Sequence, residues 1–188
     1  MRVVRVERAD LPAYTEGIRR VYADTFSEPP WHEDPSAGAE YTDRLADDAA
    51  HPGFTAALAL DGDAVTGFAT AWTTPAVFPS ERSYGQVAEA LGPERVEALL
   101  CGAVEVDELA VAPAARGTGL GANLLSAVTE HAPDGRCWLL TSLRAEATVR
   151  FYARRGWHQL PLPVPGRAGL VVLLGPNHPG ATEHAADR

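Results

Sequence analysis

The pattern of apolar residues predicts an α/β fold, with a central, twisted, mixed sheet flanked by helices. Short apolar runs bounded by turn residues alternate with longer segments in which apolar residues recur every three or four positions. Some of the predicted strands are joined by tight turns and others through helices, so antiparallel and parallel pairs are both expected. The predicted order is β-α-α-β-β, a helical insertion, then β-α-β-α-β-β.

The first predicted elements are a strand over residues 3–6 and two helices. Asp10 is expected to cap a helix that begins at Leu11-Pro12, because proline is favoured in the first helical turn. The helix ends before Pro29-Pro30, since a residue that precedes proline is pushed out of the helical region. A second helix is expected over about 37–49. The apolar face of the first helix is predicted to contain Ile18, Val21, Tyr22 and Phe26.

A hairpin and an insertion follow. Residues 54–60 and 65–72 are apolar strands, joined by the tight turn Asp61-Gly62-Asp63. The stretch 73–103 is an expected insertion between the third and fourth strands. It holds a proline-punctuated loop and a helical pattern over 86–100 that Gly92-Pro93 interrupts.

The remaining elements are a strand at 104–111, a helix that finishes before Pro133, a strand at 137–143 and a helix at 146–155 stopped by Gly156. Strands at 157–160 and 170–174 flank Pro165-Gly166. Residues 1–175 are therefore expected to form one domain, and the small, polar residues 176–188 a flexible tail. The helix that finishes before Pro133 is predicted to have Leu120, Leu124, Leu125 and Val128 on its apolar face.

Composition and charge exclude several classes of function. The formal net charge is −9, which argues against a nucleic-acid partner and is compatible with a cationic acceptor or with a simply soluble surface. The sequence has no lysine, so Schiff-base chemistry and a Walker A site are excluded. It has no apolar run of about 20 residues and no signal-peptide core. We therefore expect a cytoplasmic protein without a membrane partner, and the composition favours a bacterial source.

Cysteine and histidine patterns predict neither a disulfide framework nor a metal site. Cys101 and Cys137 are not arranged as a CxxC pair, and burial as small apolar residues is the simplest interpretation of both. The six histidines are scattered without the spacing of metal ligands.

A glycine-rich turn between a strand and a helix is the strongest chemical signal. Glycines stand at positions 117, 119 and 121, directly after the strand 104–111 and at the start of the next helix. Free N–H groups of a first helical turn attract an anion, and glycine lets the backbone approach phosphate oxygens closely. Arg116 adds a positive charge. The segment 104–128 is therefore a predicted phosphate or pyrophosphate site.

Two common phosphate motifs fit poorly. Walker A is excluded because Gly-Lys-Ser/Thr is missing. Gly117, Gly119 and Ala122 formally match a dinucleotide fingerprint, but that fold needs an acidic residue after the next strand, where Arg144 stands. The remaining chain is also too short for the further βα units.

The turn resembles the Q/R-x-x-G-x-G/A motif of the GCN5-related N-acetyltransferase (GNAT) superfamily. The resemblance extends back to Leu109-Ala110-Val111-Ala112-Pro113, similar to an L-x-V-x-P approach. It extends forward to Phe151–Trp157, which resembles the YxxxGF/W segment, and it includes the order of elements.

The resemblance implies acetyl-CoA as co-substrate. The backbone of Leu109, Ala110 and Val111 would pair with the pantetheine arm. Many relatives carry an asparagine after the next strand, and residues 144–147 contain none, so that pantetheine contact stays unassigned. The backbone N–H groups implied for the pyrophosphate belong to Arg116, Gly117, Thr118, Gly119, Leu120, Gly121 and Ala122.

The same resemblance implies the catalytic groups. Tyr152 stands where relatives place a general acid, with a packing tyrosine as the alternative. Glu105 ranks first and Glu108 second as the base that deprotonates the amine, and an ordered-water relay is the remaining alternative. Alternation along a strand places Glu105 and Asp107 on one face and Glu108 on the other, unless a bulge shifts the register.

The acceptor site is expected among the first two helices, the loop between them and the insertion. Phe26, Glu28, Trp31 and Trp72 are its candidate residues, because aromatic rings and acid suit a cationic amine; the tryptophans could equally anchor loops. The predicted activity is acetylation of a primary amine on a small molecule. Acetylation of a protein N-terminus or lysine, and a non-catalytic acyl-CoA-binding module, are the alternatives. A homodimer, common in the family, stays open.

Overall fold

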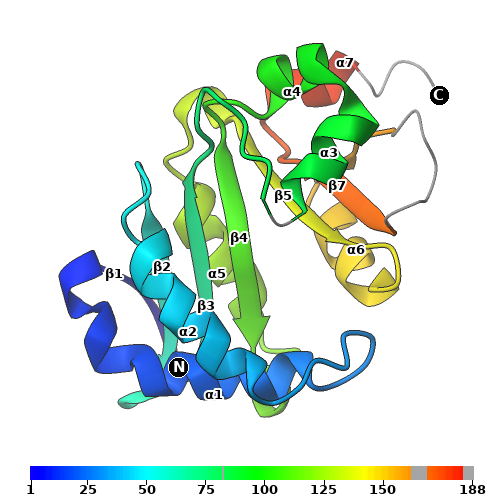
Figure 1. Ribbon diagram of the computed structural model, residues 1–188. Coiled ribbons are helices and arrows are strands. Elements are labelled where there is room, and N and C mark those ends of the chain that lie inside the picture. Colours follow the sequence, from blue (N-terminus) through cyan, green and yellow to red (C-terminus); the bar gives the residue numbers. More distant parts are fainter. Residues whose placement is uncertain (82, 162–168, 184–188) are drawn as a thin grey trace. The chain divides into compact units, whose positions relative to one another are not determined.

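The computed structural model describes residues 1–81, 83–161 and 169–183, and within them seven strands form one mixed sheet (Figure 1). The strand order is β1-β2-β3-β4-β5-β7-β6. The turn predicted around Pro165-Gly166 lies outside the described residues. The strands are β1 (Arg2–Val6), β2 (Thr55–Asp61), β3 (Ala64–Thr73), β4 (Val104–Val111), β5 (Cys137–Ser142), β6 (His158–Gln159) and β7 (Leu170–Leu174).

The chain divides into two compact units, and β4 contributes to both. Unit 1 comprises Met1–Trp72 and Val106–Glu130, and unit 2 comprises Thr73–Glu105 and His131–Arg188. Glu105 therefore belongs to unit 2, whereas Asp107 and Glu108 belong to unit 1. The expectation of a single domain over residues 1–175 stays a prediction.

Unit 1 is a three-layer arrangement, with α1 (Thr15–Phe26) and α2 (Ala37–Asp48) on one face of the strands and α5 (Leu120–Thr129) on the other (Figure 1). β1, β2 and β3 pair antiparallel, with Leu58 opposite Phe68. The residues predicted for the apolar faces of α1 and α5 are all buried. The amino group of Met1 lies 3.9 Å from a carboxylate oxygen of Asp61 at the β2–β3 turn.

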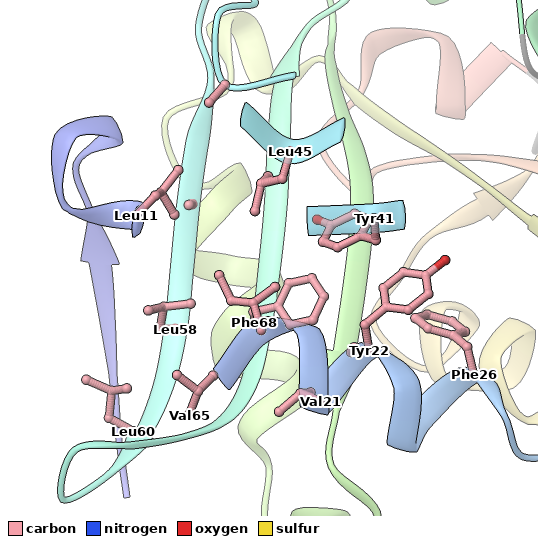
Figure 2. Packing of buried hydrophobic residues seen from close by; sticks show 14 residues of the cluster. Leu11, Val21, Tyr22, Phe26, Tyr41, Leu45, Leu58, Leu60, Val65 and Phe68 are labelled. Atoms are coloured by element: carbon pink, nitrogen blue, oxygen red, sulfur yellow. The ribbon is translucent and has the colours of Figure 1, made fainter. Parts of the chain in front are cut away.

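Aromatic rings fill the core of unit 1 beneath α1 and α2. Tyr22 and Tyr41 stack with ring centroids 4.6 Å apart, and Tyr41 lies 5.4 Å from Phe68 (Figure 2). Phe26 packs 4.5 Å from Tyr22, at the end of α1. The core beneath the helices is therefore aromatic where β3 and β4 lie and aliphatic nearer β1 and β2, where Leu11, Leu58 and Leu60 pack (Figure 2).

The expected start of the first helix is wrong. The structure has a 3-10 helix, η1 (Arg8–Tyr14), followed by α1 from Thr15, and no side chain caps either element. Pro12 contributes to the difference, because it has no N–H to donate to the carbonyl oxygen four residues before it, as an α-helix would require. The end of α1 at Phe26, before the two prolines, agrees with the expectation.

Unit 2 is built on β5 and β7, which pair antiparallel, with β6 antiparallel to β7. Two helices, α3 (Tyr84–Leu91) and α4 (Pro93–Leu99), lie between the third and fourth strands and are separated at Gly92, as the sequence predicts. Their apolar faces belong to a second core that includes Trp138, Leu160, Val172 and Leu174. The helix α6 (Glu146–Ala153) follows β5.

The expectation of a flexible tail over residues 176–188 is wrong for its described part. Residues 179–183 form the short helix α7 (Pro179–Glu183). His178 is buried, and its two ring nitrogens lie 2.9 Å from the Leu99 carbonyl oxygen and 3.1 Å from the Gly180 nitrogen. These partners satisfy the hydrogen-bonding groups of the buried imidazole. The polar composition of the tail did not predict that His178 would be buried. Residues 184–188 lie outside the described part.

None of the helices in the described residues is both long and apolar enough to cross a bilayer.

Candidate functional site

The glycine-rich turn has the geometry of an anion site. β4 ends at Val111, the 3-10 turn η2 (Pro113–Ala115) follows, and α5 begins at Leu120. Gly117 and Gly119 have φ of 76° and 86°, a region that disfavours other residues. A Cβ added at either position would meet no heavy atom within 4 Å, apart from those of the adjoining residues. The backbone therefore lies open to a ligand at both glycines.

The start of α5 leaves donors for such a ligand. The N–H groups of Ala122 and Asn123 donate to the Gly119 carbonyl oxygen, which places the first intrahelical bonds after the turn. Thr118 donates its hydroxyl to the Ala115 carbonyl oxygen at 2.7 Å and so braces the turn from within. The N–H groups of residues 117–121 precede the helical ladder, and an anion is their natural acceptor.

Arg116 and Glu28, predicted for the phosphate and the acceptor respectively, bind each other. The Arg116 guanidinium donates to the Glu28 carboxylate at 2.8 Å and to the Val111 carbonyl oxygen at 3.3 Å. Both side chains are nearly half exposed, so this ion pair is weak and a phosphate can compete for the guanidinium.

The strand residues implied for pantetheine already have some protein partners. Ala110 is buried, and Leu109 and Val111 are half-buried. The Leu109 N–H donates to the Glu108 carboxylate at 3.3 Å. The Val111 carbonyl oxygen accepts from the Thr25 hydroxyl at 3.3 Å. A pantetheine arm would have to share or replace these bonds.

Carboxylates gather beside the aromatic core of unit 1. Asp107 accepts a hydrogen bond from Thr70 at 3.3 Å, and the Thr70 hydroxyl is 3.1 Å from the Tyr41 hydroxyl. Glu33, from the loop after α1, accepts from the Tyr22 hydroxyl at 3.1 Å. We call Glu33, Asp107 and Glu108, with Tyr22 and Tyr41, the acidic-aromatic cluster.

Charges in this cluster affect one another strongly. Burial and the neighbouring Asp107 raise the pKa of Glu108 to about 8, with Glu33 adding to the effect. Burial, then Asp107 and Glu108, raise the pKa of Tyr41 well above its usual range. Asp107 and Glu108 thus both act on one hydroxyl, although alternation predicts opposite faces for them. Arg44 opposes these effects only partly, and its guanidinium also lies 3.3 Å from the Asp48 carboxylate.

Glu105, the first-ranked base, lies in a different environment in unit 2. Its carboxylate is buried, and both of its oxygens lie 3.0 Å from the Tyr84 hydroxyl, which donates to them. Tyr84 begins α3 and is itself buried. The Glu105 carboxylate thus accepts from a phenol, whereas Asp107 and Glu33 lie near Glu108 and raise its pKa against the opposing effect of Arg44.

Tyr152, the predicted general acid, is buried on α6 in unit 2. Its ring packs against Phe151 and Trp157 with centroids 5.1 and 5.6 Å apart. The Trp157 N–H donates to the Tyr152 carbonyl oxygen at 3.2 Å, which closes the end of the helix next to Gly156. The tyrosine therefore has both a packing environment and the sequence context of a general acid.

The aromatic acceptor candidates lie in two places within unit 1. Trp31 packs edge-on against Phe26 with centroids 5.6 Å apart, next to the acidic-aromatic cluster through Tyr22. Trp72 is buried at the end of β3 and stacks on His51 at 4.9 Å. The structure thus joins Phe26 and Trp31 in one group, whereas Trp72 packs with a separate partner.

The two thiols are poorly suited to nucleophilic chemistry. Burial raises the pKa of Cys137 to about 11, and its sulfur lies against Gly175, where an added Cβ would be 2.2 Å away. Burial also raises the pKa of Cys101. Since the thiolate is the reactive form, both stay largely unreactive near neutral pH. The described residues contain no cluster of three or more His, Cys, Asp or Glu side chains that could hold a metal ion.

Sequence reasoning missed Glu33, Tyr41, Thr70 and Tyr84. Tyr41 lies in the expected second helix and Thr70 inside an apolar strand, and neither matches a catalytic or binding motif. Tyr84 lies in a stretch that matches no motif. Only Glu33 carried a signal, because it closely follows Glu28 and Trp31 in the loop expected to border the acceptor site.

The sequence matches the Acetyltransferase (GNAT) family over residues 15–157, which includes β4, the glycine turn and Tyr152. A search of curated proteins gives no significant match.

Solved structures share the fold at low sequence identity. A protein from Desulfovibrio desulfuricans described as belonging to the GNAT family is 24% identical, with a TM-score of 0.59 over 92% of this chain and 95% of its own. Aminoglycoside 6′-acetyltransferase type Ii is 16% identical, with a TM-score of 0.60 over 93% and 96%. Ribosomal-protein-alanine N-acetyltransferase from Brucella melitensis is 18% identical, with a TM-score of 0.51 over 93% and 97%. The last two are named for very different acceptors, so the fold does not identify the acceptor of this chain.

Proposed function

The chain belongs to the acetyltransferase (GNAT) family, and from this premise we propose that it transfers an acetyl group from acetyl-CoA to a primary amine of a small, cationic molecule. The amine attacks the acetyl carbonyl directly, and CoA leaves as a thiol. We place this reaction in the cytoplasm, as the sequence leads us to expect.

The donor side of the proposal rests on the turn between β4 and α5. The N–H groups of residues 117–121 would bind the pyrophosphate of CoA, and Gly117 and Gly119 leave the backbone accessible. Arg116 would exchange its exposed partner Glu28 for a phosphate oxygen. The other contacts to the pyrophosphate would come from backbone N–H groups. The site therefore needs no lysine, and the sequence contains none.

The acidic-aromatic cluster is the observation that carries the acceptor side. Like charges held together in a partly buried place destabilise one another, and here they raise the pKa of Glu108 to about 8. A bound ammonium group would relieve that repulsion. A cationic amine therefore fits this cluster better than a neutral or acidic acceptor.

In this proposal Glu105 is the general base and Tyr152 the general acid. An amine that binds as an ammonium ion must lose a proton before it can attack, and we assign this proton to the Glu105 carboxylate, whose two oxygens face the Tyr84 hydroxyl. Glu108 would instead bind the cationic acceptor in its ionised form, which a bound ammonium group favours.

The protonated state of the two thiols favours direct attack over an acetyl-cysteine intermediate. Both have raised pKa values, and Cys137 is buried against Gly175. Neither offers a thiolate near neutral pH.

The donor site is tested by Gly119→Ala, with Gly62→Ala as a matched control. Both glycines have positive φ and open space around the added Cβ, so the two changes impose a similar backbone strain, but Gly62 lies in the β2–β3 turn. Calorimetry should show acetyl-CoA binding about tenfold weaker for Gly119→Ala only, since a displaced N–H group loses its charge-assisted bond. Equal affinity in both variants would contradict the site.

The acceptor is tested by CoA release against a panel that contains an aminoglycoside, a linear polyamine, a neutral amine and a peptide with a free N-terminus. The proposal expects the highest kcat/KM for a small polycationic amine. Preference for the peptide would favour the protein-acetyltransferase alternative. Tight acetyl-CoA binding without release of CoA to any amine would favour a non-catalytic module.

A further inference from the structure

Tyr84 lies outside the recognised motifs and contacts a candidate catalytic group. It begins α3, in the segment between β3 and β4 that matches no motif in the sequence. Its hydroxyl lies 3.0 Å from each oxygen of Glu105, at the start of β4. Both side chains are less than 10% exposed, so water competes little for this contact.

The ring of Tyr84 is held on its apolar side. Phe78 meets it edge-on, with centroids 5.4 Å apart, and Phe78 also packs 6.1 Å from Trp138. Trp138 is fully buried and donates its indole N–H to the Thr74 hydroxyl at 2.8 Å. This chain of packed rings restricts the phenol, so the hydroxyl has a defined position from which to hold the carboxylate.

We propose that Tyr84 is a positioning residue for Glu105, and that the α3–α4 segment thereby contributes to the chemistry of the acetyl transfer. The inference rests on the proposed function, in which Glu105 is the base. A donor placed between both carboxylate oxygens fixes the plane of the carboxylate and stabilises its ionised form. Each oxygen keeps lone pairs that can accept the proton of an ammonium ion.

The proton balance of the step leaves Tyr84 unchanged. Glu105 takes one proton from the ammonium group, and the freed nitrogen lone pair attacks the carbonyl carbon of acetyl-CoA. The C–N bond forms, the C–S bond breaks and the sulfur receives a proton, from Tyr152 in the proposed function. The nitrogen loses a second proton as the amide forms, which restores the proton of Tyr152, and Glu105 releases the first proton to solvent. Tyr84 keeps its own proton throughout and acts only through Glu105, so its role differs from that of Tyr152.

The test compares Tyr84→Phe, Glu105→Gln and the double variant, with Tyr14→Phe as a matched control for loss of a phenol hydroxyl. Tyr14 packs against the core of unit 1. The probe is acetyl-CoA with the best amine of the panel, assayed by CoA release from pH 6 to 9.5. Circular dichroism and thermal unfolding report whether each variant folds.

We expect kcat of Tyr84→Phe to fall about tenfold, with KM for both substrates within about twofold of the wild type, because the contact orients the base and not the substrates. The acid limb of its kcat profile should move to higher pH, since the ionised carboxylate loses a donor. The double variant should be no slower than Glu105→Gln alone, because Tyr84 acts only through that carboxylate. Tyr14→Phe should match the wild type in every kinetic parameter.

Three results would overturn the inference, and they can be told apart. If Glu105→Gln is inactive while Tyr84→Phe keeps the wild-type kcat and pH profile, the positioning role is wrong and the proposed function stands. If Glu105→Gln keeps wild-type kcat, the assignment of the base is wrong and the positioning role falls with it. If no amine releases CoA, the proposed function itself fails.

Discussion

Glu105 and Glu108 are three positions apart on β4 and have opposite environments. Glu105 is buried in unit 2 beneath the hydroxyl of Tyr84, a neutral donor that favours a charged carboxylate. Glu108 belongs to unit 1, where Asp107 and Glu33 are its neighbours and its pKa rises to about 8. The same residue type on the same strand is therefore suited to accept a proton at one position and to bind a cation at the other.

The neighbours of a strand, more than the strand itself, determine the environments of its carboxylates. Tyr84 comes from α3 and Glu33 from the loop after α1, so segments remote in sequence make the two environments different.

Glu105→Gln should give the largest effect, with kcat at least about 100-fold lower and little change in acetyl-CoA affinity, because a general base contributes on the order of 100-fold or more. Steady-state kinetics with the best amine, together with calorimetry for acetyl-CoA, measure both quantities. A larger loss of kcat in Glu108→Gln than in Glu105→Gln would reverse the two roles.

Glu108→Gln should raise KM for the acceptor about tenfold and leave kcat within about threefold. In the wild type, acceptor affinity should increase as pH rises through about 8, because Glu108 ionises there and a cationic amine favours the ionised form. Acceptor KM measured at pH 7, 8 and 9 should lose this dependence in the variant. An unchanged dependence would show that another group titrates.

The smallest expected effect concerns stability. Because the pKa of Glu108 is raised in the folded state, the folded protein holds a proton that the unfolded chain releases between about pH 4.5 and 8. Stability should therefore fall as pH rises through this window. Glu108→Gln should reduce that fall by on the order of 1 kcal/mol, after a discount for solvent screening. Urea unfolding at pH 5 and 8 tests it, with the exposed Glu40→Gln as control, and equal slopes in both variants would contradict the prediction.

Local patterns were sufficient to predict most of the fold. The four apolar residues predicted for α1 and the four for α5 are all buried, and β4 has the predicted bounds, because burial of one face follows helical or strand periodicity. The 3-10 helix at Pro12 and the helix α7 were missed, since both depend on contacts or backbone geometry that periodicity does not encode.

The candidate site also has a part that the sequence predicted and a part that it did not. The glycine turn could be predicted because consecutive residues form it, from Arg116 to the first turn of α5. The partners of Glu105 and Glu108 could not, because Tyr84, Glu33 and Thr70 reach those carboxylates or their neighbours only through the tertiary fold. The ion pair between Arg116 and Glu28 could not be predicted either, because the tertiary fold brings these two separately predicted residues together.

The absence of lysine has a practical consequence for assays of acetyl transfer. None of the 188 residues has a primary amine on its side chain. Radiolabelled acetyl groups found on the protein after incubation with acetyl-CoA therefore cannot come from lysine side chains, which removes the commonest source of background in such an assay.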